Sequence, residues 1–139
     1  KYKNGFRNRH VEEVTMQNIY NYADIISLHV PLTKDTQHLV NTEFISKMKN
    51  PFYLLNTSRG PVVSNQDLVQ GLKKKKILGA ALDVIENENF KFSTIEPERN
   101  LDYLLNCENV IITPHIAGLS KESNKKLSEV LIAKILEII

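Results

Sequence analysis

Residues 25–30 have the sequence IISLHV, a short run of β-branched and other apolar side chains that stops at Pro31. Proline has no backbone N–H and cannot donate to a sheet ladder, so the run predicts a buried strand that ends there. Three further runs of this kind, each followed by polar residues, glycine or proline, lie at 52–56, 78–84 and 110–113. The sequence therefore predicts four such strands.

Segments with helical spacing of apolar side chains alternate with these runs. One follows Thr42 and another follows Ser64, and both hydroxyl residues are the expected N-caps because they can accept from a free N–H of the first turn. From Ser120 onward, apolar residues at 127, 131, 135 and 138 predict a long amphipathic helix. The alternation predicts an α/β fold with a parallel sheet. Residues 87–104 are polar and mixed, which predicts a long functional loop after the third run.

Composition limits the class of protein. The chain has 139 residues and a net charge of +2, which fits a single globular domain and argues against a nucleic-acid partner. No apolar run approaches the ~18 residues of a membrane-spanning helix. The single cysteine, Cys107, can form neither an internal disulfide nor a cysteine-based metal cage, and no metal site is expected. We expect a cytoplasmic protein, and the start at Lys1 indicates a piece of a longer chain.

Three chemically active side chains follow successive runs, at the sheet edge where open α/β sheets bind ligands. Arg59 offers a rigid fork for the carboxylate of a 2-oxo or 2-hydroxy acid. His115 can move the hydroxyl proton, and a carboxylate of Glu86 or Glu88 can fix its tautomer and favour imidazolium. This set predicts a carbonyl-reducing site, although a histidine after a strand is, from residue type alone, more often structural than catalytic.

Four motifs at these strand ends together resemble the NAD-dependent D-isomer-specific 2-hydroxyacid dehydrogenases, the group of D-lactate and D-3-phosphoglycerate dehydrogenases. They occur in the family's order: ADIISLHVPLT, LLNTSRGPVV, LGAALDV and VIITPHIAG, within residues 23–118. The resemblance implies a Rossmann-like, doubly wound parallel sheet. It also implies an oxidoreductase that transfers a hydride between NAD(H) and a D-2-hydroxy acid or 2-oxo acid.

The resemblance assigns roles to individual residues. Arg59 corresponds to the family's substrate-binding arginine and His115 to its acid/base histidine. The family's catalytic glutamate lies five positions after the aspartate of the LDV motif, which selects Glu88, although Asn89 stands where many members have proline. Glu86 remains the alternative.

The resemblance also implies which residues contact the cofactor. They are Val30, Pro31, Thr36, Thr57, Ser58, Arg59, Asp83, His115 and Gly118. Pro31 can equally be a strand terminator and Gly118 a turn residue. Asp83, a charge at the end of an apolar run, is harder to explain as packing.

Other expected parts of the family's domain are absent from these residues. No G-x-G-x-x-G occurs, and the resemblance places it upstream, together with the acidic residue that reads the ribose. NAD is the expected cofactor, and NADP is left open. Residues 1–119 are then part of an NAD(P)-binding domain, with 11–14 as a short third strand. Residues 120–139 form a helix that returns toward a substrate domain, and the full-length protein is expected to be a homodimer.

Two alternatives to an active enzyme stay open. Relatives of this fold act as dinucleotide-binding corepressors or sensors, and the chain can also be an inactive truncated fragment. The isolated fragment is expected to be unstable and inactive, because the strand at 25–30 would lack a neighbour and expose unpaired backbone.

Overall fold

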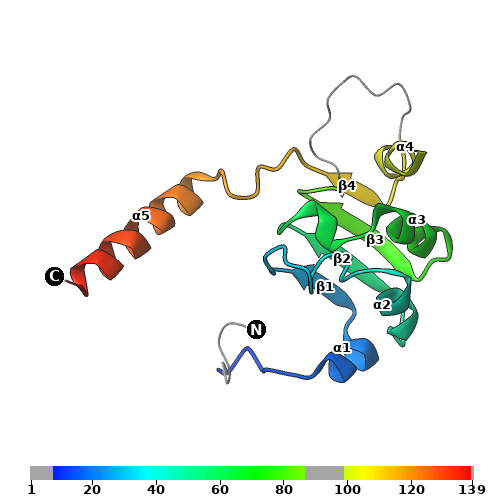
Figure 1. Ribbon diagram of the computed structural model, residues 1–139, viewed down its shortest axis with the longest axis horizontal. Helices are drawn as coiled ribbons and strands as arrows, with labels where there is room; N and C mark the ends of the chain where they lie inside the picture. The colour runs from blue at the N-terminus through cyan, green and yellow to red at the C-terminus, as the bar shows by residue number, and fades with distance from the viewer. Residues whose placement is uncertain (1–7, 87–98, 139) are drawn as a thin grey trace.

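The computed structural model describes residues 8–86 and 99–138 (Figure 1). The helices are α1 (Met16–Tyr22), α2 (Thr42–Lys47), α3 (Asn65–Lys73), α4 (Arg99–Leu105) and α5 (Lys121–Leu136), with a short 3-10 turn, η1 (Gly60–Val62). The strands are β1 (Ile25–Leu28), β2 (Phe52–Asn56), β3 (Ile77–Leu82) and β4 (Val110–Ile112).

The four strands form one parallel sheet in the order β1-β2-β3-β4, as the sequence predicted. Ile26 pairs with Leu54, Leu54 with Ala80, and Ala80 with Val110. β2 has the predicted bounds, whereas β1 and β3 end two residues earlier than predicted. All four strands point the same way, so their carboxyl ends meet at one edge.

One face of the sheet is covered by α2, α3 and α4 (Figure 1). Phe52, Leu54 and Ile77 are almost fully buried against Leu68 of α3 and its neighbours. The other face is open in the described residues, where the exposed fractions of Ile25 and Ile111 are 63% and 67%. The architecture is that of a Rossmann-like α/β sheet, and the described helices cover one of its two faces.

The helix starts confirm one predicted cap and correct the other. Ser64 caps α3, because its hydroxyl accepts from the backbone N–H of Asp67. Thr42 was expected to cap α2, but the cap is Asn41, whose side chain accepts from the N–H of Phe44. The Thr42 hydroxyl instead donates to Oδ1 of Asp67 at 2.7 Å, which ties α2 to α3. Asn41 and Thr42 are both able to cap a helix. The Thr42 hydroxyl is engaged by Asp67, and Asn41 serves as the cap.

Two predicted elements are wrong. Residues 11–14 do not form a strand, because Val11 makes only an isolated bridge with Asn8 and finds no strand to pair with among the described residues. The expected loop at 87–104 contains α4, whose Leu104 is fully buried. Residues 87–98 lie outside the described residues. Leu101, Leu104 and Leu105 have helical spacing, and Leu104 packs on the core.

Helix α1 was not among the predicted elements. Thr15 caps this helix, and Ile19 and Tyr20 pack on the core. The rings of Tyr20 and Phe44 meet edge to face, with 5.4 Å between their centroids. The apolar positions 16, 19, 20 and 23 have helical spacing, so the pattern was present but short.

The predicted C-terminal helix is confirmed as α5, and Ser120 is its N-cap. α5 extends away from the sheet (Figure 1), and its apolar residues are exposed, with Leu127 at 65% and Leu131 at 60%. Its return toward a substrate domain, and the domain boundary at residue 119, stay predictions. Within the described ranges, no helix is long and apolar enough to cross a membrane.

Candidate active site

A buried asparagine shapes the loop that carries Arg59. Asn56, the last residue of β2, is fully buried, and its Oδ1 accepts from both the backbone N–H and the hydroxyl of Ser58. Its Nδ2 donates to the carbonyl oxygen of Arg59 at 3.0 Å. These three bonds fold residues 56–59 into a tight turn, which leaves Arg59 exposed at the sheet edge. The Arg59 guanidinium donates to the carbonyl oxygen of Ser58 at 2.6 Å.

Gly60 brings this loop into backbone contact with the end of β3. A Cβ at position 60 would lie 1.8 Å from the carbonyl oxygen of Ile85, well inside any permitted contact. Only glycine allows the two chains to approach so closely. The Arg59 loop and the residues after β3 are therefore neighbours, as the sequence predicted.

Asp83 holds the loop that carries His115. Its carboxylate accepts from the hydroxyl of Thr113 and from the backbone N–H groups of Ile116 and Ala117, at 2.5 to 2.9 Å. Only 6% of Asp83 is exposed. Burial acts to raise the pKa of Asp83, but the hydrogen bonds from these three residues and the nearby His115 outweigh it, so the pKa lies below its ordinary value.

His115 is exposed and sits in the left-handed backbone region, with φ of 55°. Its N–H donates to the carbonyl oxygens of Asp83 and Thr113. The N–H of Asp83 in turn donates to the carbonyl oxygen of Asn56 at 2.9 Å. A chain of bonds through Asn56 and Asp83 thus joins the Arg59 loop to the His115 loop. A left-handed non-glycine residue carries backbone strain, which these bonds offset.

The loop after β1 completes the edge. The Thr36 hydroxyl donates to the carbonyl oxygen of Pro31 at 2.6 Å and accepts from the N–H of Thr33. The N–H of His38 donates to the carbonyl oxygen of Pro61, so this loop lies beside the residues that follow Arg59. Val30 is half-buried and Pro31 is exposed.

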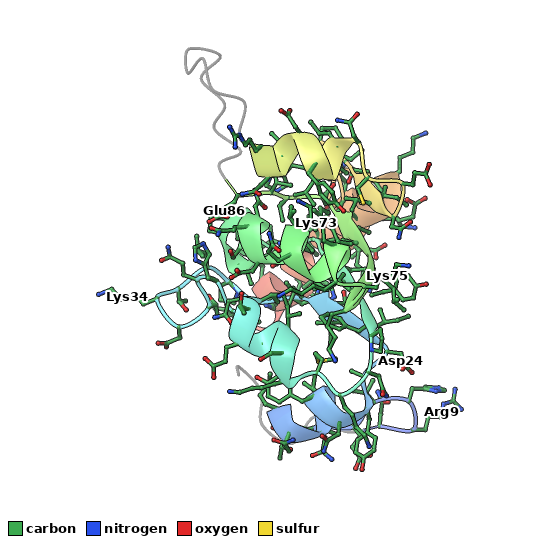
Figure 2. All side chains as sticks on the ribbon, turned by 90° about the vertical axis from the view of Figure 1, so that its right-hand side faces the viewer. Arg9, Asp24, Lys34, Lys73, Lys75 and Glu86 are labelled. Carbon is green, nitrogen blue, oxygen red and sulfur yellow. The ribbon has the colours of Figure 1, made fainter. Side chains whose placement is uncertain are left out.

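The two candidate glutamates differ in what the structure describes. Glu86 lies at the N-terminal end of α3, and Lys73 marks the other end of this helix (Figure 2). Its Oε1 contacts Nε2 of His38, and its Oε2 accepts from the N–H of Asn65. Glu88 lies outside the described residues. Both oxygens of Glu86 thus have partners in segments other than the His115 loop.

The predicted cofactor contacts differ in exposure. Val30 is half-buried, Pro31, Thr57 and Arg59 are exposed, and Ser58 is buried with its hydroxyl bound to Asn56. Gly118 lies in a turn, which the bond from the N–H of Leu119 to the carbonyl oxygen of Ile116 closes, so the prediction of a turn residue is confirmed. Its φ is not left-handed, and a Cβ there would meet nothing within 4 Å. The described residues contain no cluster of side chains that could hold a metal ion.

Sequence reasoning did not identify the residues that shape the site. Asn56 and Thr113 end two of the apolar runs in the sequence; in the structure Asn56 organises the Arg59 loop and Thr113 binds Asp83. A polar residue at the end of an apolar strand was the available sign, because buried polar groups in proteins are hydrogen-bonded.

The chain is similar to known NAD-linked dehydrogenases over most of its length. The family described as "D-isomer specific 2-hydroxyacid dehydrogenase, NAD binding domain" matches residues 1–117. A glyoxylate reductase of Thermofilum pendens is 42% identical over 119 residues, which cover 86% of this chain and 33% of the relative. A D-lactate dehydrogenase of Lactiplantibacillus plantarum is 40% identical over 74% of this chain and 32% of its own length.

Solved structures show the same fold. The D-lactate dehydrogenase of Lactobacillus jensenii with NAD+ superimposes with a TM-score of 0.74 at 30% identity, over 94% of this chain and 42% of that one. The Aquifex aeolicus D-lactate dehydrogenase with NAD and lactic acid gives a TM-score of 0.71 at 36% identity, over 91% and 42%. The chain spans about a third to two fifths of the length of these relatives. From its motifs, its fold and these similarities, the chain belongs to the NAD-binding domain family of the D-isomer-specific 2-hydroxyacid dehydrogenases.

Proposed function

We propose that the protein containing this chain is an NAD-dependent oxidoreductase that interconverts a D-2-hydroxy acid and a 2-oxo acid. The observation that carries this proposal is the chain of hydrogen bonds through Asn56 and Asp83, which fixes the Arg59 loop and the His115 loop at one sheet edge. A carboxylate-binding guanidinium and a proton-transferring imidazole at one edge are the two groups that carbonyl reduction requires.

In this reaction Arg59 binds the substrate carboxylate and orients the keto group. Its guanidinium is free to turn outward, because in the described structure it is held by one bond to a neighbouring carbonyl oxygen. His115 donates a proton to the keto oxygen during reduction and removes it during oxidation. Bound NAD(H) supplies the hydride acceptor or donor.

The acid partner of His115 is Glu88. Support comes from the position of Glu88 five residues after Asp83, and from the engagement of both Glu86 oxygens elsewhere. A carboxylate beside the imidazole would fix its tautomer and favour imidazolium, which is the form that donates a proton.

NAD(H) would be held along the carboxyl ends of the strands. Val30 and Pro31 would contact the adenine, Thr36 the phosphates, and the backbone of Thr57, Ser58 and Arg59 would line the site. Asp83, His115 and Gly118 would contact the nicotinamide. Three of the roughly four lone pairs of the Asp83 carboxylate are used, so one remains for the carboxamide.

The substrates, assembly and location are proposed for the full-length protein. Relatives named glyoxylate reductase and D-lactate dehydrogenase support a small 2-oxo acid as substrate. The exposed apolar residues of α5 and of the open sheet face support burial against further protein, which we assign to the rest of the chain and to a homodimer. The net charge of +2 supports the absence of a nucleic-acid partner. We also assign the enzyme to the cytoplasm, without a membrane partner. Residues 1–139 alone, without a Gly-rich phosphate loop, are expected to be inactive.

The test is turnover by the full-length protein. NADH oxidation is followed by absorbance with pyruvate, glyoxylate, hydroxypyruvate and phosphohydroxypyruvate, with NADPH in a parallel series. Turnover of at least one 2-oxo acid that is lost in His115→Ala supports the proposal. Tight NADH binding without turnover across the panel would instead indicate a sensor or corepressor.

A further inference from the structure

Glu86 joins three segments that are far apart in the sequence. Its Oε1 lies 2.5 Å from Nε2 of His38, which belongs to the loop after β1. Its Oε2 accepts from the N–H of Asn65, the first residue of α3, at 3.0 Å. Glu86 itself follows β3, and it lies beside the start of α3 (Figure 2). One carboxylate therefore links the segments after β1, β2 and β3.

The segments that Glu86 joins are those that carry proposed site residues. His38 is two residues from Thr36, has a left-handed φ of 50°, and donates its N–H to the carbonyl oxygen of Pro61. Asn65 ends the short stretch of chain that begins at Arg59. The side-chain bond from Glu86 thus holds a strained residue of one loop against the other loop.

The contact between Glu86 and the Arg59 loop is reinforced by the backbone. Gly60 packs so closely against Ile85 that a Cβ would overlap its carbonyl oxygen. Glu86 is thus held close to both loops. The two loops are also bonded to each other directly, through the parallel bridge between Val40 and Val63, so the Glu86 side chain reinforces an existing backbone contact.

This pair differs from an ordinary surface ion pair. On α2, Glu43 and Lys47 also lie 2.5 Å apart, but their side chains are 71% and 49% exposed, and they are neighbours on one helix. The side chains of Glu86 and His38 are 22% and 43% exposed and lie 48 positions apart. A partly buried carboxylate with two fixed partners, one of them at a helix N-terminus, determines geometry more strongly than an exposed pair does.

We propose that Glu86 is a positioning residue, which fixes the Arg59 loop relative to the loop that carries Thr36. It acts through these loops and not through the reacting atoms. The role in turnover rests on the dehydrogenase activity proposed above, whereas the role in holding the two loops does not.

The test uses the full-length protein with Glu86→Ala, Glu86→Gln and the control Glu43→Ala. We expect Glu86→Ala to lower kcat/KM for the 2-oxo acid by about 10- to 100-fold, mainly by raising KM, since small displacements of a binding group have effects of this size. Glu86→Gln should stay within about threefold of wild type, because an amide oxygen can still accept from the Asn65 N–H. Glu43→Ala should stay within about twofold.

Three outcomes would overturn the positioning role. Wild-type KM and kcat in Glu86→Ala would mean that the link does not matter. A loss in Glu86→Gln as large as in Glu86→Ala would show that the reaction needs the charge itself. An equal loss in Glu43→Ala would reveal an effect of general destabilisation.

A second readout keeps the inference testable if the full-length protein turns over no 2-oxo acid. Amide hydrogen exchange reports local opening without any substrate. In Glu86→Ala we expect the amides of His38 and Asn65 to exchange at least about tenfold faster than in wild type, with the amides of α2 unchanged. Unchanged protection at His38 and Asn65 would refute the inference, whereas absence of turnover with faster exchange would refute only the proposed function.

Discussion

Replacing Asp83 by asparagine tests whether its carboxylate holds the His115 loop. Asparagine is nearly isosteric, but one of its two terminal groups is an NH2 that cannot accept a hydrogen bond. Oδ1 of Asp83 accepts from Thr113 and Ile116, and Oδ2 accepts from Ala117. The best orientation of the amide keeps the first two bonds and sets its NH2 against the N–H of Ala117.

The structure gives the expected size of the effect. An unsatisfied buried donor costs about 1–3 kcal/mol, and each remaining bond weakens by roughly 1 kcal/mol when its acceptor loses its charge. Burying a neutral amide is easier than burying a carboxylate and offsets part of this loss. We expect the free energy of unfolding to fall by about 2–4 kcal/mol, a large share of a typical stability of roughly 5–15 kcal/mol.

The assay is urea unfolding of the full-length protein followed by circular dichroism, since this chain contains no tryptophan. Asp24→Asn, at an exposed aspartate before β1, is the control and should change stability by less than about 0.5 kcal/mol. In the same Asp83→Asn protein, the displaced His115 should lower kcat by roughly 10- to 100-fold. A change in stability below about 0.5 kcal/mol together with wild-type turnover would refute the reasoning.

Three further predictions concern pH, glycine and arginine. The folded pKa of Asp83 lies below its ordinary value of 3.8, so the stabilisation by its carboxylate should be fully present above about pH 4 and lost as pH falls through the folded pKa. The free energy of unfolding should therefore fall less steeply with pH in this range in Asp83→Asn than in wild type. Equal steepness in the two proteins would count against a stabilising role of the charged carboxylate. Gly60→Ala should lower the free energy of unfolding by about 1–3 kcal/mol or more, because its Cβ would overlap the carbonyl oxygen of Ile85. Gly118→Ala should keep the wild-type Tm and raise the KM for NADH, because its Cβ meets no protein atom. A lower Tm in Gly118→Ala with an unchanged KM would argue against a cofactor contact at Gly118. Arg59→Lys should raise the KM for the 2-oxo acid and lower kcat in steady-state kinetics, because an ammonium cannot make the bidentate contact, and wild-type values would exclude Arg59 as the carboxylate ligand.

Much of the fold followed from local patterns. The four strands, the helices after positions 42 and 64, and α5 each have an apolar periodicity that is readable within a few residues. The two errors have different origins. Leu101, Leu104 and Leu105 of α4 have helical spacing, which the mixed composition of 87–104 concealed, whereas residues 11–14 do not form a strand because no described strand pairs with them.

The candidate site divides in the same way. The sequence alone determined which reactive side chains follow the strands, among them Arg59 and His115, because strand ends and residue types are local properties. Only the tertiary structure decided that Asp83 binds the His115 loop and that Glu86 binds His38. Those partners lie 30 to 48 positions apart. The sheet register and the crossover connections bring them together, and neither can be read from local periodicity.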